Sequence, residues 1–131
     1  MEAAVQQSRT MTYAGWGLSV IVILFLVMDF TMKFMQLPIV ISTTEQLGWP
    51  ASNITTLAVL LLLSTALYAF PKTSVLGAIL LTGYLGGAIA THLRIGSALF
   101  SHVLFGVYLA LFVWGGLYLR DARIRALIPL R

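Results

Sequence analysis

The sequence predicts an all-α fold, a four-helix transmembrane bundle whose helices run alternately up and down. The chain has 131 residues, of which 60% are hydrophobic and 9% are charged, whereas soluble domains carry about 25% charged residues. Its mean hydropathy is +0.96, and the apolar residues fall into four runs near the ~20 residues that cross a bilayer. A chain of this size cannot shield so much apolar surface from water. We therefore expect one integral membrane domain over residues 1–131, with lipid as its solvent.

The first span is expected over about residues 13–35, after a short polar lead. The run is longer than the core of a signal peptide, contains Asp29 and has no small-residue cleavage site close behind it. Residues 36–49 form an outer loop that is too polar to span. Trp49, at the end of this loop, suits the headgroup level of a membrane.

The second span is expected over about residues 51–70, where Ser52 or Asn53 can cap the first turn. Pro71 ends this helix, because proline lacks the amide proton that a continuing helix uses. The third span then runs over about residues 73–93, with Thr73 or Ser74 as its cap.

The fourth span is expected over about residues 98–119, followed by a basic tail at the membrane surface. Orientation follows from the basic residues in the short flanks, because cytoplasmic loops carry the excess of lysine and arginine. One side has Arg9, Lys72, Arg120, Arg123, Arg125 and Arg131, and the other has Lys33 and Arg94. This asymmetry predicts that both termini are cytoplasmic.

The composition also limits the function classes. The net charge of +4 comes from residues at the ends of apolar runs, which indicates membrane orientation and not a nucleic-acid partner. The chain has no cysteine, which excludes thiol relays, iron–sulfur ligation and thioether-linked haem. A redox role would need a bound cofactor or a redox protein partner at the membrane.

The ionisable residues inside the spans gather at one end of the predicted bundle. Asp29 and Lys33 lie near the end of the first span, His92 and Arg94 near the end of the third, and His102 near the start of the fourth. In an up-and-down bundle these three places are on the same side of the membrane. Because intramembrane ionisable groups are costly, they predict a binding site.

Asp29 and Lys33 are spaced i, i+4 with the acid first, the favourable order for an ion pair on a helix. The pair can simply neutralise itself while Lys33 extends to the interface. Alternatively, Asp29 binds a ligand or a proton.

The two histidines admit a similar choice. A hairpin that turns near Gly96 brings His92 and His102 to similar depth, where they can form interhelical hydrogen bonds or a proton relay. Ligation of haem b is the less favoured alternative. Arg94 suits a headgroup contact or an anionic part of a ligand, and no HxxxH or HExxH pattern supports a metal site.

Small and aromatic residues add further features. Gly83, Gly86 and Gly87 form a stripe of small residues, for which we expect packing within this bundle, with homodimerisation as the alternative. Tyr84 lies in the same stretch. A pocket for a flat ring such as a quinone could be lined by Tyr68, Tyr84, Tyr108, Trp114 and Tyr118, although interfacial anchoring and core packing are the commoner roles of such residues.

Several segments resemble the DoxX-like family of small bacterial membrane proteins. They are the central turn Tyr68–Ala78, the segment Leu81–Arg94, the triplet Phe100–His102, the ending Trp114–Arg125 and the Asp29-x-x-x-Lys33 element. The resemblance implies a four-helix membrane bundle in the bacterial inner membrane. It also implies an association with thiosulfate:quinone oxidoreductases, terminal oxidases or redox-defence complexes. Most members of the family have no assigned activity.

Three functions fit these observations. The first is a non-enzymatic, accessory or ligand-binding membrane subunit linked to quinone-dependent redox processes. The second is a small enzyme that acts on a lipid-like substrate, with Asp29 and His92 as acid and base and Arg94 holding an anionic group. The third, a carrier or channel, is the least favoured, because the polar residues cluster at one end and draw no line through the bilayer.

Overall fold

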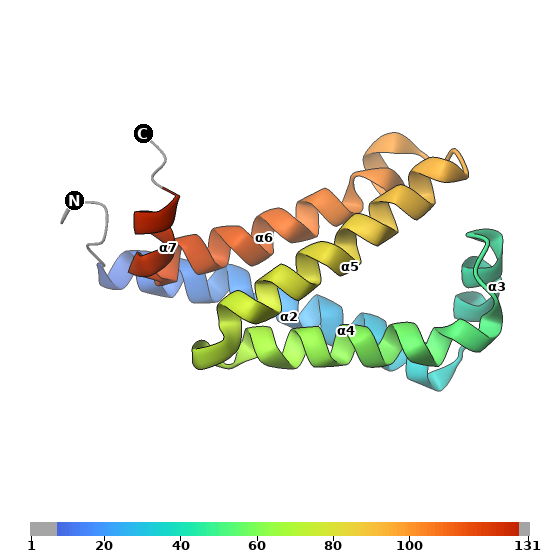
Figure 1. Ribbon diagram of the computed structural model, residues 1–131, viewed down its shortest axis with the longest axis horizontal. Helices are drawn as coiled ribbons and strands as arrows, with labels where there is room; N and C mark the ends of the chain where they lie inside the picture. The colour runs from blue at the N-terminus through green and yellow to red at the C-terminus, as the bar shows by residue number, and fades with distance from the viewer. Residues whose placement is uncertain (1–7, 129–131) are drawn as a thin grey trace.

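The computed structural model describes residues 8–128, and all regular secondary structure in this range is helical. Its helices include four that are long and apolar enough to cross a membrane. Their α-helical parts are α2 (Arg9–Met35), α4 (Ile54–Ala69), α5 (Ser74–Arg94) and α6 (Phe105–Arg120) (Figure 1). The predicted all-α, four-span architecture is thus confirmed, and the chain is a multi-pass membrane protein.

Helix α2 begins at Arg9, earlier than the predicted start of the first span. The Ser8 hydroxyl accepts a hydrogen bond from the Met11 amide at 3.1 Å, which satisfies one of the amides that a helix start leaves without a partner. The helix ends where Gln36 adopts the left-handed conformation, with a φ of 50°. This turn reverses the chain after the first span.

The outer loop contains a helix of its own, α3 (Pro38–Gln46). Pro38 occupies its first turn, where the missing amide proton costs nothing. Gly48, with a φ of 90°, turns the chain after α3 toward the second span. As predicted, this segment does not span.

The turn between the second and third spans is a short 3₁₀ helix, η2 (Pro71–Thr73). The predicted side-chain caps are wrong here, because neither Thr73 nor Ser74 accepts an amide of α5. Thr73 Oγ1 instead donates to Leu67 O at 2.6 Å, and Ser74 Oγ donates to Tyr68 O at 2.7 Å. These hydroxyls satisfy the carbonyls that α4 leaves free at its end.

The start of the second span also differs from the prediction. A 3₁₀ turn, η1 (Ala51–Asn53), precedes α4, and no side chain caps either element. The fourth span begins with a π-helical turn, η3 (Leu99–Val103), where a regular helix was expected. After α6, the chain forms a short helix α7 (Ala122–Leu127), which Asp121 caps through the amide of Arg123.

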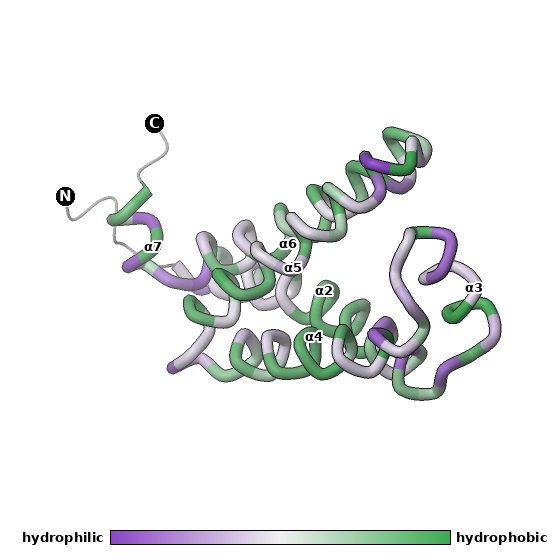
Figure 2. Tube along the Cα trace, turned by 45° about the vertical axis from the view of Figure 1, so that its right-hand side comes forward, coloured by the Kyte–Doolittle hydropathy of each residue, from purple (hydrophilic) through white to green (hydrophobic). Residues whose placement is uncertain are grey.

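The four spanning helices are arranged in a ring in the order α2, α4, α5 and α6, with each helix contacting the next and α6 contacting α2. The start of α2 lies with α7 at one end of the bundle, and α3 lies at the other (Figure 1). Hydrophilic residues gather toward these two ends, and the middle of the bundle is mostly apolar (Figure 2). This distribution fits a bilayer around the middle.

The end that carries α7 is tightly closed by glycines. A Cβ on Gly15 would lie 2.6 Å from Gly116 O, so α2 and α6 approach backbone to backbone at this point. A Cβ on Gly77 would lie 2.5 Å from Tyr68 Cα, so α5 and α4 do the same. Small residues permit such contacts between membrane helices. We call this the closed end.

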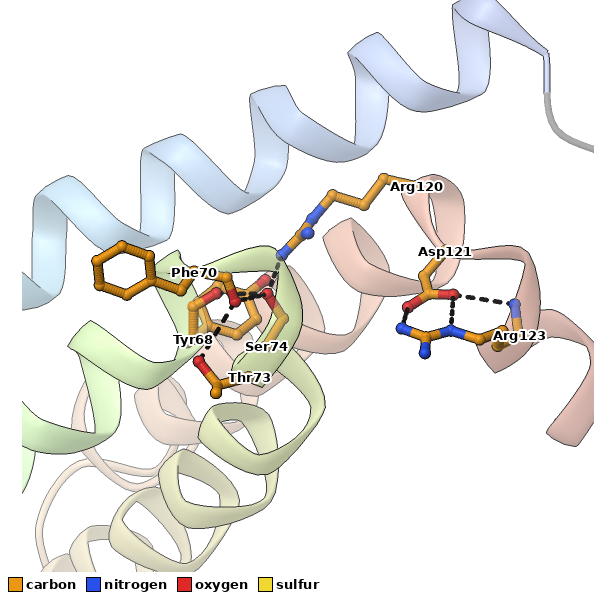
Figure 3. A network of polar contacts seen from close by, with 7 residues as sticks. All are labelled: Tyr68, Phe70, Thr73, Ser74, Arg120, Asp121 and Arg123. Atoms are coloured by element: carbon orange, nitrogen blue, oxygen red, sulfur yellow. Dashed lines mark hydrogen bonds and ion pairs between the residues drawn. The ribbon is translucent and has the colours of Figure 1, made fainter.

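A buried hydrogen-bond network also joins the helices at the closed end. The Tyr68 hydroxyl donates to Val113 O at 2.7 Å and lies 2.9 Å from Ser19 Oγ. Arg120 Nε donates to Ser19 Oγ at 3.0 Å. Tyr68 is fully buried, and Figure 3 shows the positions of Tyr68 and Arg120. Because every member has partners, the network fixes the relative positions of α2, α4 and α6.

Candidate ligand-binding site

At the opposite end the helices diverge, with α5 and α6 on one side and α2 and α4 on the other (Figures 1 and 2). A cavity of about 540 Å³ lies there, and residues of all four spanning helices and of α3 line it. Most of the lining is hydrophobic, with residues such as Phe25, Leu26, Leu57, Leu85 and Leu109. A cavity of this size is typical of a site for a small organic ligand.

Asp29 and Lys33 form the predicted ion pair in the wall of this cavity. Lys33 Nζ lies 2.6 Å from Asp29 Oδ1. The side chain of Lys33 is 16% exposed and that of Asp29 is 37% exposed, so neither is fully shielded. The pair neutralises the net charge of this wall, and the second carboxylate oxygen of Asp29 remains an acceptor for a ligand.

His92 and His102 line the same cavity, although they come from α5 and from the π-helical turn η3. Their ring centroids are 5.7 Å apart, as the prediction of similar depth requires. His92 Nδ1 lies 3.1 Å from Ser97 Oγ, and His102 Nδ1 lies 2.7 Å from Ser101 Oγ. These serines orient the two rings, so the Nε2 atoms are the nitrogens left to contact a ligand.

Tyr84 completes the polar part of the lining. No residue in the described range 8–128 forms a hydrogen bond with its hydroxyl. A tyrosine hydroxyl that lies away from water usually has a partner. Tyr84 therefore offers the cavity one free donor and acceptor group.

Among the ionisable residues predicted to form the site, Arg94 alone does not line the cavity. Its Nη2 atom donates to Leu47 O at 3.0 Å, and its guanidinium packs against Gly48. The prediction that it contacts a ligand has no support from this placement. Arg94 instead ties the end of α5 to the segment that follows α3.

The stripe of glycines on α5 does not pack as predicted. A Cβ on Gly83, Gly86 or Gly87 would meet no atom of the chain within 4 Å. No close contact between helices therefore forms at these three positions. Gly83 and Gly87 line the cavity instead. Homodimerisation through this face stays a prediction.

Sequence reasoning missed the contribution of α3 to the site. Ile39, Val40, Thr43 and Thr44 all line the cavity, together with Trp49 beyond the helix. Pro38, followed by three apolar and then three hydroxyl residues, was a signal for a short helix, but nothing in the sequence placed that helix over the divergent end. The other predicted aromatic residues, Tyr68, Tyr108, Trp114 and Tyr118, are absent from the lining of this cavity.

The donor set bears on metals and cofactors. Among the described residues, no group of three or more histidine, cysteine, aspartate or glutamate side chains could hold a metal ion. The cavity thus offers imidazole, phenol and carboxylate groups for hydrogen bonds to an organic ligand.

The model of the DoxX-like family matches residues 17–116. The chain belongs to the DoxX-like family. The match includes Asp29, Lys33, Tyr84, His92, Arg94 and His102 and ends before Arg120 and α7. No curated protein and no solved structure matches the chain. The function of this DoxX-like protein is therefore inferred from the residues of the site.

Proposed function

We propose that this DoxX-like protein is an accessory membrane subunit, without enzymatic activity of its own, that binds a lipid-soluble molecule with a polar ring, such as a quinone. One observation carries the proposal, namely that the cavity combines an apolar lining with Asp29, Tyr84, His92 and His102. The apolar wall suits an isoprenoid or acyl tail, and the polar groups suit a ring with carbonyl oxygens.

Quinone carbonyls accept hydrogen bonds, so a quinone site needs donors. The Tyr84 hydroxyl is a donor without a partner among the described residues. An imidazole whose Nδ1 atom accepts from a serine carries its proton on Nε2 and is a second donor. Gly83 and Gly87 leave the wall beside Tyr84 free of side chains, which suits a flat ring.

In this role the cavity lies toward the outer face of the bacterial inner membrane. Arg9, Lys72, Arg120 and Arg123 lie on the side of the closed end, and the positive-inside rule assigns that side to the cytoplasm. The partner is a membrane or peripheral redox protein, because a chain without cysteine cannot itself carry thiol or iron–sulfur chemistry. A homo-oligomer through the exposed face of α5 is compatible with this role.

The test is ligand binding by the full chain purified in mild detergent. Native mass spectrometry and an absorbance spectrum first identify any retained molecule; a Soret band indicates haem b and a quinone spectrum indicates the proposed ligand. A short-chain ubiquinone analogue is then titrated while the fluorescence of Trp49, which lines the cavity, is followed. Trp49→Phe should abolish the quenching.

Tyr84→Phe should weaken quinone binding by about three- to tenfold, the effect of losing one hydrogen bond. The matched control is Tyr108→Phe, because the Tyr108 hydroxyl donates to Phe100 O at 3.0 Å and does not line the cavity. Equal affinities of the two variants, or no binding by the wild-type protein, would refute the proposal.

A small enzyme acting on a lipid-like substrate is the second candidate, and one observation favours it. Asp29 and His92, the proposed acid and base, line the same cavity. Turnover by the purified protein that is lost in both Asp29→Ala and His92→Ala, with unchanged unfolding midpoints, would favour the enzyme. A carrier or channel is less well supported, because glycine packing and the Tyr68 network fill the closed end.

A further inference from the structure

Arg120 lies at the end of the fourth span, at the opposite end of the bundle from the cavity. Its guanidinium carbon is 3.9 Å from the centroid of the Trp16 ring and 5.5 Å from that of Tyr68. Its Nε atom donates to Ser19 Oγ at 3.0 Å. Its Nη2 atom donates to Ser74 Oγ at 3.4 Å (Figure 3). The cation is thus held half-buried between aromatic rings and neutral hydroxyls.

None of these contacts supplies a negative charge. The adjacent acid, Asp121, accepts from Arg123 with both carboxylate oxygens, at 3.1 and 2.9 Å. No carboxylate among residues 8–128 forms an ion pair with Arg120. Asp121 acts on Arg120 only through space. A half-buried cation is costly unless an anion is paired with it in direct contact.

The position of Arg120 indicates where an anion comes from. It ends a helix of membrane-spanning length, and Trp16 beside it is of the residue type enriched at headgroup level. A guanidinium uses two N–H groups for Ser19 and Ser74 and has three others. Its planar fork matches the geometry of phosphate oxygens.

We propose that Arg120 binds the phosphate of an anionic phospholipid and that this lipid completes the network at the closed end. The lipid phosphate then neutralises the cation, while Ser19, Ser74 and Trp16 hold the guanidinium in place. Arg125 is not available for the same purpose, because it is buried and its Nη1 atom donates to Tyr118 O and Leu119 O. This inference is independent of the ligand in the cavity.

The structure offers a matched control for the test. Arg123 is on the same side of the bundle, but its side chain is 76% exposed and pairs with Asp121. Arg120→Gln and Arg123→Gln therefore remove the same charge, from a half-buried position without a paired carboxylate and from an exposed position with one. Glu2→Gln serves as a second control, because it removes the acid near the start of the chain.

The experiment compares the full-length chain in detergent with added phosphatidylglycerol, phosphatidylcholine or inorganic phosphate. Native mass spectrometry counts lipid adducts, and thermal unfolding measures the shift that each additive causes. We expect phosphatidylglycerol, but neither other additive, to form an adduct and to raise the midpoint of the wild-type protein, of Arg123→Gln and of Glu2→Gln. Arg120→Gln should bind phosphatidylglycerol about fivefold more weakly, the effect of one interfacial charge.

Each other outcome overturns the proposal. Equal adducts on Arg120→Gln and Arg123→Gln would show that any basic residue suffices. A full midpoint shift with inorganic phosphate alone would identify a free-anion site and not a lipid site. If Arg120→Gln does not fold, Arg120→Lys keeps the charge but not the fork, and undiminished phosphatidylglycerol binding by this variant would contradict the role of the guanidinium.

Discussion

Replacing Gly77 with alanine is expected to force the closed end of the bundle apart, whereas replacing Gly86 with alanine on the same helix is not. The new Cβ at residue 77 would lie 2.5 Å from Tyr68 Cα and 2.7 Å from the carbonyl carbon of Leu67. Both are backbone atoms of α4, so no rotamer change can relieve the overlap. The same Cβ at residue 86 would have no neighbour within 4 Å.

The expected size of the effect follows from these neighbours. Overpacking a tight contact costs about 1–3 kcal/mol, and moving α4 away would also stretch the hydrogen bonds of the Tyr68 hydroxyl, each worth about 1 kcal/mol. Gly86→Ala should be neutral, or stabilising by up to about 1 kcal/mol, because alanine restricts the unfolded backbone more than glycine does. The two variants should therefore differ in free energy of unfolding by about 3 kcal/mol or more.

The assay is reversible unfolding of each variant in detergent, followed by circular dichroism against denaturant concentration. The wild-type protein gives the reference midpoint and slope, and the slopes should be equal if the variants differ only in stability. Midpoints that coincide for Gly77→Ala and Gly86→Ala would refute the reasoning, because the two changes are chemically identical and differ only in what the new methyl group meets.

Three further outcomes are expected. Asp29→Asn and Lys33→Met should each lower the unfolding midpoint, and the double variant should recover about 1 kcal/mol, since each single change leaves the other charge unpaired near lipid; strictly additive midpoints would contradict a coupled pair. Arg94→Ala should speed hydrogen exchange over residues 38–48 but not in the spans, because it removes the contact with the segment after α3; unchanged exchange there would show that other contacts hold α3. The Arg123 side chain, which hydrogen-bonds to the Asp121 carboxylate, holds the pKa of Asp121 below its usual value, so the stability that this contact gives α7 is present at neutral pH and is lost as pH falls below about 4. Protease cleavage within residues 122–127 should rise below about pH 4. The Asp121→Asn variant should be cleaved equally there and at neutral pH.

Much of the fold could be predicted because a membrane leaves few choices. Backbone groups inside lipid must be paired within the segment, so an apolar run of sufficient length becomes a helix. Short connections make successive helices antiparallel, which is why Asp29, His92 and His102 were expected at one end of the bundle. The structure places all three in the lining of one cavity.

The helix ends were harder to predict. Hydroxyl residues at 73 and 74 were expected to cap the following helix, but they bind the carbonyls of the preceding one. Both choices satisfy a free backbone group, and only the path of the turn decides between them. The π-helical turn at Leu99–Val103 likewise has no sequence signal that periodicity would detect.

Composition and connectivity by themselves determined that this protein has four spanning helices. They also determined which end of the bundle holds the ionisable residues inside the spans, and which end holds most of the basic residues that flank the spans. Only the tertiary structure decided which glycines are contacts. A GxxxG spacing indicates that another helix can approach the backbone closely. In the structure such close approaches occur at Gly15, Gly77 and Gly116. They do not occur at Gly83, Gly86 or Gly87. The physical reason is that the approach and the divergence of helices depend on contacts between residues far apart in the chain. The cavity results from the divergence at one end of the bundle, and the partners of Arg120 result from the close approach at the other.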